Sequence, residues 1–144
     1  VHNGFVTFNK EKMSKSLGNI ITISDAVKKY TGQVVRLALL SAHYSQPLDW
    51  NDELLSNQKN TLDKWYNLYQ EQKNYETLDT TDILLDDLNT PGFIAKIHEL
   101  YNQASSGDLG KKSLLTILLK FLLKIVFKSE NFQSSSFLLG KPVR

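Results

Sequence analysis

The most informative stretch of this 144-residue chain is KMSKSLGN, residues 12–19. It carries two lysines three positions apart, Lys12 and Lys15, together with Ser14, Ser16 and a following Gly18. Lysine ammonium groups, serine hydroxyls and backbone N–H groups are donors that suit phosphate oxygens, and a glycine lets the backbone come close to a ligand. Phosphoryl and adenylyl transfer depend mainly on positioning and on stabilising charge. The composition of the stretch therefore fits a phosphate-binding loop.

The same composition also fits a solvated surface turn, which is the commoner role of a lysine- and serine-rich loop. The stretch lacks the Gly-x4-Gly-Lys-Ser/Thr spacing of the phosphate-binding loop found in many nucleotide hydrolases. The residues alone leave both interpretations open.

On either side of this stretch, the pattern predicts short elements. β-branched and aromatic residues predict a short strand within residues 2–8 and a second over residues 20–23. Ser24 is expected to cap a helix over residues 25–30. A further helix is expected from residue 34 to residue 43.

After Pro47, helical periodicity predicts three helices: residues 52–73, a helix capped by Thr90 and a last helix that ends at Lys128. Asp49 or Asn51 is expected to cap the first of them. The positions expected to face the core are Leu55, Leu62, Trp65 and Tyr69 in the first helix and Phe93, Ile97, Leu100 and Ala104 in the second. The last helix carries a lysine stripe and is too short to span a membrane.

The predicted fold class is therefore mainly α. A small strand-and-loop module, residues 1–48, is expected to precede an antiparallel helical bundle, residues 49–144. The balance of 17 basic and 15 acidic side chains is too even to indicate a nucleic-acid binder by charge alone. Cysteine is absent, so these residues form no disulfide and no thiolate metal site, which fits a cytoplasmic location.

Residues 12–19 match, letter for letter, the signature loop of class I aminoacyl-tRNA synthetases. Three further runs resemble the cysteinyl-tRNA synthetase family: HNGFV at residues 2–6, LSAHY at residues 40–44 and DDLNTP at residues 86–91. The resemblance extends to about residue 105. It implies a fragment of a larger α/β synthetase that runs from the signature loop through a helical tRNA-binding bundle. Residues 1–48 would be the end of the catalytic region, whose nucleotide-binding part lies outside this chain together with the anticodon-reading region.

The resemblance also implies roles for individual residues. Lys15 would be the main ligand of the ATP phosphates, with Lys12 assisting, and Met13, Ser14 and Ser16 would share the site. His2 would lie near the adenine or amino-acid pocket, or would be a structural histidine bonded to backbone. The chain alone is expected to be inactive.

In the intact enzyme, the resemblance implies ATP with Mg²⁺, cysteine and tRNA(Cys) as reactants, and a monomeric, cytoplasmic protein without membrane attachment. A zinc ion is expected in the intact enzyme but not on this segment, where none of the family's ligand positions occurs. His43, Tyr44 and Arg36 fall in a region that contacts tRNA in related synthetases, although Arg36 could equally form an internal salt bridge. Asp86 and Asp87 are expected to order the turn before the following helix.

Two other functions stay open from the sequence. One is a non-catalytic tRNA- or protein-binding helical domain that has kept the loop. The other is a related ligase that joins cysteine to an amino-sugar.

Overall fold

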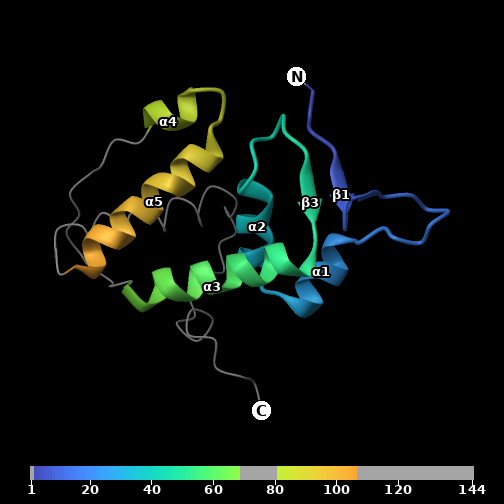
Figure 1. Ribbon diagram of the computed structural model, residues 1–144, viewed down its shortest axis with the longest axis horizontal. Coiled ribbons are helices and arrows are strands. Elements are labelled where there is room, and N and C mark those ends of the chain that lie inside the picture. The colour runs from blue at the N-terminus through green and yellow to red at the C-terminus, as the bar shows by residue number, and fades with distance from the viewer. Residues whose placement is uncertain (1, 69–80, 107–144) are drawn as a thin grey trace, which may run out of the picture.

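Short strands and helices follow one another in residues 2–68 and 81–106, the parts of the chain that the computed structural model describes (Figure 1). The elements are β1 (Val6–Phe8), β2 (Glu11–Lys12), α1 (Ile23–Lys29), α2 (Gly32–Leu40), β3 (Leu48–Trp50), α3 (Asp52–Leu68), α4 (Thr81–Leu85) and α5 (Thr90–Ser105). The predicted fold class, mainly helical with a small strand-and-loop module, is confirmed. The lysine-striped helix predicted up to Lys128 lies outside the described residues.

The three strands form one sheet in the order β2-β1-β3. β1 pairs antiparallel with β2 and parallel with β3, and Thr7 stands opposite both Lys12 and Asp49. Paired residues present their side chains on the same face of a sheet. Phe8 and Trp50, one position on, belong to the face that packs against the core. Lys12 therefore lies on the face directed away from the core.

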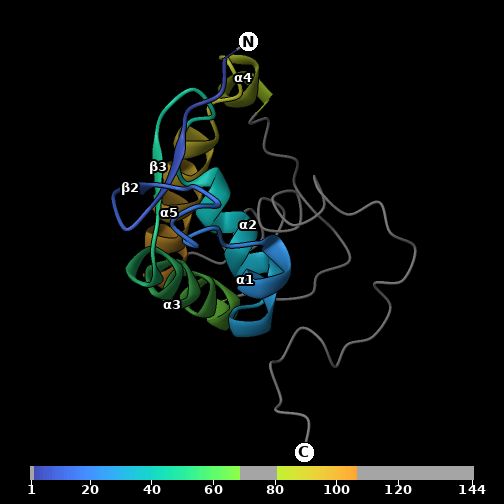
Figure 2. The same cartoon turned by 90° about the vertical axis from the view of Figure 1, so that its right-hand side faces the viewer.

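The parallel pairing of β1 with β3 requires a crossover between them, and α1 and α2 supply it. Figures 1 and 2 show that the chain enters β1 from the end of the molecule at which α4 lies. The segment between β1 and α1 then extends away from α4 and α5 (Figure 1).

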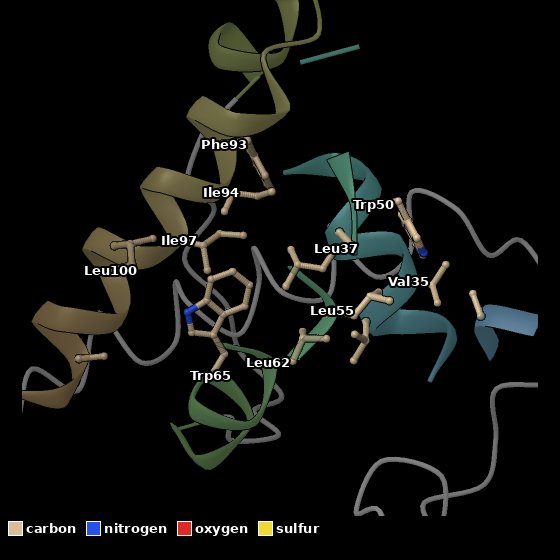
Figure 3. Packing of buried hydrophobic residues seen from close by; sticks show 14 residues of the cluster. Val35, Leu37, Trp50, Leu55, Leu62, Trp65, Phe93, Ile94, Ile97 and Leu100 are labelled. Atoms are coloured by element: carbon tan, nitrogen blue, oxygen red, sulfur yellow. The ribbon is translucent and has the colours of Figure 1, made fainter. Parts of the chain in front are cut away.

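The core lies where α2, α3 and α5 meet (Figure 3). Leu37 of α2, Trp65 of α3 and Ile97 of α5 are at most 1% exposed. The predicted core positions are confirmed at Leu55, Leu62, Trp65, Phe93, Ile97, Leu100 and Ala104. Tyr69, also predicted to be buried, lies outside the described residues. None of the described helices has the length and apolar character needed to cross a membrane.

Two predictions about the start of α1 are wrong. The helix begins at Ile23, and its N-cap is Thr22 rather than Ser24: the hydroxyl oxygen of Thr22 accepts a hydrogen bond from the N–H of Asp25 at 3.1 Å. The Thr22 hydroxyl also donates to the Asp25 carboxylate at 2.7 Å, so the two side chains close the first turn together. Residues 20–22 pair with no strand among the described residues, which removes the strand predicted there.

Of the N-caps predicted for the later helices, one is wrong and one is confirmed. Asn89, not Thr90, caps α5, because its side-chain oxygen accepts a hydrogen bond from the N–H of Gly92 at 2.8 Å. Asn51 caps α3 as expected, accepting from the N–H of Leu54 at 2.7 Å. Thr31, just after the end of α1, caps α2. The strands β2 and β3 and the short helix α4 were not predicted.

Gly4 marks the point where the segment before β1 meets the segment before β3. Its N–H donates to the carbonyl oxygen of Tyr44 at 2.7 Å, and the Leu48 N–H donates to the Phe5 carbonyl at 2.9 Å. A Cβ atom on Gly4 would lie 2.0 Å from the carbonyl oxygen of Gln46. A side chain at this position would therefore force the two segments apart.

We expect Gly4→Ala to lower the free energy of unfolding by about 1–3 kcal/mol, the usual cost of overpacking. Gly32→Ala is the matched control, because a Cβ at Gly32 would meet nothing within 4 Å and alanine suits the first turn of a helix. Urea unfolding followed by tryptophan fluorescence measures both. Equal stabilities of the Gly4→Ala variant and the unchanged protein would contradict the close approach.

Candidate functional site

The signature loop, residues 12–19, begins on a β-hairpin that was not predicted from the sequence. Asn9 and Lys10 join β1 to β2, and both have positive φ angles, 50° and 67°. Two left-handed residues between paired strands are typical of a two-residue hairpin turn of type I′. Asparagine adopts this conformation more readily than most residues, and it was the one local signal for the turn. The loop therefore leaves the edge of a sheet.

The strand alternation continues into the loop. Lys12 is exposed on the face of the sheet directed away from the core, whereas Met13 is half-buried and packs against the core cluster. Met13 thus anchors the first residues of the loop to the protein interior. This packing accounts for an apolar residue at position 13, between polar residues on both sides.

The side-chain amide of Asn19 holds the two ends of the loop together. Its Oδ1 accepts a hydrogen bond from the Ser14 N–H at 2.8 Å, and its Nδ2 donates to the Lys12 carbonyl at 3.2 Å. The loop between these contacts is a closed turn, in which the Gly18 N–H donates to the Lys15 carbonyl at 3.2 Å and Gly18 has a φ of 63°.

The two serine hydroxyls take part in this turn. Ser14 Oγ accepts a hydrogen bond from the Leu17 N–H at 3.2 Å and lies 3.2 Å from Ser16 Oγ. Ser14 is half-buried and Ser16 is exposed. The hydroxyl of Ser14 therefore stabilises the turn around Lys15, and that of Ser16 stands on the solvent side of the same turn.

The ammonium groups of Lys12 and Lys15 are unpaired within the part of the chain that the structure describes. Both side chains are exposed. The cations that do pair with carboxylates there are Lys28, Lys29, Lys59 and Lys96. His43 also approaches the carboxylate of Asp87. A signature loop with two free cations can receive an anionic ligand without first breaking an ion pair.

His2 is the remaining predicted site residue. It is exposed, and within the described residues no hydrogen bond joins it to the signature loop or to backbone. The structure therefore brings Lys12, Met13, Ser14, Lys15 and Ser16 together and leaves His2 apart from them. Its proposed place near an adenine or amino-acid pocket stays a prediction.

His43 and Tyr44 contact the turn between α4 and α5. His43 Nε2 lies 2.7 Å from the carbonyl oxygen of Asp87, and the Tyr44 hydroxyl donates to Asp87 Oδ1 at 2.7 Å. The hydrogen bond to this carboxylate raises the pKa of the Tyr44 phenol. Asp87 and Leu88 both have left-handed backbone, with φ angles of 48° and 53°. Asp87 therefore joins this turn to the segment before β3, and the prediction that Asp86 and Asp87 order the turn itself stays a prediction.

Among residues 2–68 and 81–106, no three histidine, aspartate or glutamate side chains gather in a way that could hold a metal ion. Arg36, the other residue considered for tRNA contact, is half-buried on α2, and burial lowers the pKa of its guanidinium. Its role stays a prediction.

The closure of the loop by Asn19 can be tested by hydrogen exchange. We expect Asn19→Ala to speed exchange of the Ser14 N–H by up to about tenfold, because one hydrogen bond contributes roughly 0.5–1.5 kcal/mol. Asn19→Asp is the control, since it keeps an oxygen to accept from Ser14 and should preserve most of the protection. Equal protection of Ser14 in the Asn19→Ala variant would show that the amide does not close the loop.

Residues 1–60 match the family described as tRNA synthetases class I (C) catalytic domain. The chain is 51% identical over 124 residues to a cysteine–tRNA ligase of Pelagibacter ubique (strain HTCC1062), an alignment that covers 85% of this chain and 27% of that relative. It is 38% identical over 141 residues to the cysteine–tRNA ligase of Ehrlichia ruminantium (strain Welgevonden), which covers 92% of this chain and 29% of the relative.

The fold is similar to that of a solved LeuRS from Agrobacterium radiobacter K84, a ternary complex with tRNA and LeuAMS. The TM-score is 0.53 at 21% sequence identity, over 85% of this chain and 20% of that one, so this likeness concerns the fold alone. The chain spans less than a third of the length of the curated relatives that it matches. Over most of its length, this chain is similar in sequence to a segment of these cysteine–tRNA ligases, and its first 60 residues match the class I synthetase catalytic domain.

Proposed function

We propose that this chain is the segment of a cysteine–tRNA ligase that carries the ATP-binding signature loop and continues into the helices that dock tRNA. The observation that carries the proposal is the loop itself. KMSKSLGN forms a turn, closed by Asn19 and anchored by Met13, that presents Lys12 and Lys15 with no carboxylate partner among the described residues. Homology to cysteine–tRNA ligases supports the choice of amino acid.

In the proposed reaction, a carboxylate oxygen of cysteine attacks the α-phosphorus of ATP. The bond between that phosphorus and the bridging oxygen of pyrophosphate breaks, and the electron pair leaves with pyrophosphate. Cysteinyl-adenylate is the product. A hydroxyl of the terminal ribose of tRNA(Cys) then attacks its acyl carbon, the bond from that carbon to the phosphate oxygen breaks, and AMP leaves. Negative charge accumulates on the departing pyrophosphate, so cations directed at its oxygens lower the barrier.

We assign to Lys15 and Lys12 the role of stabilising the negative charge on the departing pyrophosphate. Lys15 lies within the closed turn and Lys12 at its sheet-bound end, so the two ammonium groups can approach a phosphate chain from neighbouring positions. Ser14 and Ser16 shape the turn that carries Lys15, and Met13 holds it to the core. ATP would enter as its Mg²⁺ complex, with the metal held by the phosphates and by residues outside this segment.

The rest of the enzyme would supply what these residues lack. We propose that it contributes the adenine-binding part of the active site and the cysteine pocket with its zinc ion, and that the segment alone is inactive. Residues 1–48 would act as the signature-loop module and residues 49–144 as the tRNA-docking bundle, in an enzyme that works as a cytoplasmic monomer. The strand β3 lies across this boundary and pairs with β1, so the first residues of the second part belong to the sheet of the first.

We expect Lys15→Ala in the intact enzyme to lower the rate of ATP–pyrophosphate exchange by on the order of 100-fold, the usual effect of removing one preorganised charge donor. The KM for cysteine should change little, because the lost interaction forms mainly in the transition state. Lys59→Ala, which removes an exposed lysine from α3, should leave exchange unchanged. An unaltered exchange rate in the Lys15→Ala enzyme would exclude the proposed role and favour a tRNA- or protein-binding domain that has merely kept the loop.

A further inference from the structure

Asp49 of β3 forms hydrogen bonds to the first strand and to the turn of the hairpin that carries the signature loop. Its Oδ1 accepts from the backbone N–H of Lys10 at 2.6 Å and from the hydroxyl of Thr7 at 2.7 Å. Its Oδ2 accepts from the side-chain amide of Asn51 at 2.9 Å. One carboxylate thus binds the strand β1, the hairpin turn and the residue that caps α3.

Few other contacts hold the turn of the hairpin in place, although Met13, just after β2, packs against the core. The strand β2 is two residues long, and the turn that precedes it requires left-handed backbone at Asn9 and Lys10, neither of which is a glycine. The second attachment of the turn is also to β3, through the Asn9 N–H and the Trp50 carbonyl at 3.2 Å. The position of β2 therefore depends on β3 as well as on β1, its direct strand partner.

The register of the strands connects the hydrogen bonds of Asp49 to the signature loop. Thr7 stands opposite Asp49 on one side and opposite Lys12 on the other. The three residues form one row across the sheet, on the face directed away from the core. A shift or rotation of the hairpin relative to Asp49 would move Lys12 directly, and the rest of the signature loop with it.

We propose that Asp49 is a positioning residue for adenylate formation: by holding Thr7 and the Lys10 N–H, its carboxylate sets the place of Lys12 and of the loop that follows. The inference rests on the proposed function of the loop. Asp49 acts through the hairpin and does not itself contact the substrate.

The ionisation of Asp49 is consistent with this role. The hydrogen bond from the Lys10 N–H, followed by that from Thr7, lowers the pKa of its carboxyl group below the ordinary value. A carboxyl group with a lowered pKa in the folded state stabilises that state above its unfolded pKa of about 3.9 and loses this effect only as the pH falls through the folded value. The carboxylate is therefore charged throughout the neutral range in which aminoacylation is assayed.

The test is a double-mutant cycle in the full-length enzyme, read by ATP–pyrophosphate exchange. We expect Asp49→Ala to lower kcat about tenfold or more, because small displacements of a catalytic group are costly, while the KM for cysteine stays within about twofold. In a Lys12→Ala background the same substitution should cost clearly less, because Lys12, the group nearest to Asp49 among those that it positions, is already gone. Asp63→Ala, which removes an exposed carboxylate from α3, is the matched control and should have no effect.

A merely structural role predicts a different result: Asp49→Ala would cost the same factor in both backgrounds, or would change nothing, and either outcome overturns the proposal. If Asp49→Ala does not fold, Thr7→Val replaces it, since this change removes one donor to the carboxylate and keeps the shape of the side chain. It should lower kcat in the same direction by a smaller factor, again less in the Lys12→Ala background. Loss of exchange in Lys15→Ala with normal exchange in Asp49→Ala and Thr7→Val would sink this inference alone, whereas normal exchange in all three would sink the function itself.

Discussion

The parallel pairing of β1 with β3 is the constraint on which the rest of this structure depends. It joins residues that lie about 40 positions apart, and it begins where Gly4 passes so close to Gln46 that no side chain fits between them. On one face of the paired strands, Phe8 and Trp50 pack against the core. On the other, Asp49 and Thr7 hold the hairpin from which the signature loop extends. The two faces of three short strands thus separate the tasks of anchoring the module and presenting its lysines.

In the signature loop, an ordered backbone fixes the positions from which two flexible lysine side chains extend. Lysine side chains carry about 2 kcal/mol of rotamer entropy, so a loop that depends on two of them gains little unless its backbone is ordered. Met13, Asn19 and the Ser14 hydroxyl order it from within, and the hairpin orders its start. A second set of contacts, from His43 and Tyr44 to Asp87, attaches the segment before β3 to the turn between α4 and α5. The segment that leads into β3 is therefore attached to the helices as well as to the hairpin.

Much of the helical part could be predicted from the sequence, because its signal is local. The spacing of Leu55, Leu62 and Trp65 and of Phe93, Ile97 and Leu100 identified buried faces that the structure confirms. Caps were harder to predict: Thr22 and Ser24, like Asn89 and Thr90, are neighbouring polar residues that each suit an N-cap, and only the backbone geometry decides between them. The strand β3 could not be foreseen, since three residues with a central aspartate carry no periodicity and become a strand only by pairing with β1. For the same reason the sequence could identify Lys12 and Lys15 but not Asp49, whose contacts lie 39 and 42 positions away.

The central claim is that the ordered loop brings Lys15 to the phosphates of ATP. A crystal structure of the intact enzyme with a non-hydrolysable ATP analogue and cysteine tests it most directly. We predict that Lys15 Nζ lies within hydrogen-bonding distance of the β- or γ-phosphate oxygens, while the hydrogen bonds of Asn19 to Ser14 and of Asp49 to Lys10 persist. A fully occupied nucleotide whose phosphates contact neither Lys15 nor Lys12 would contradict the account.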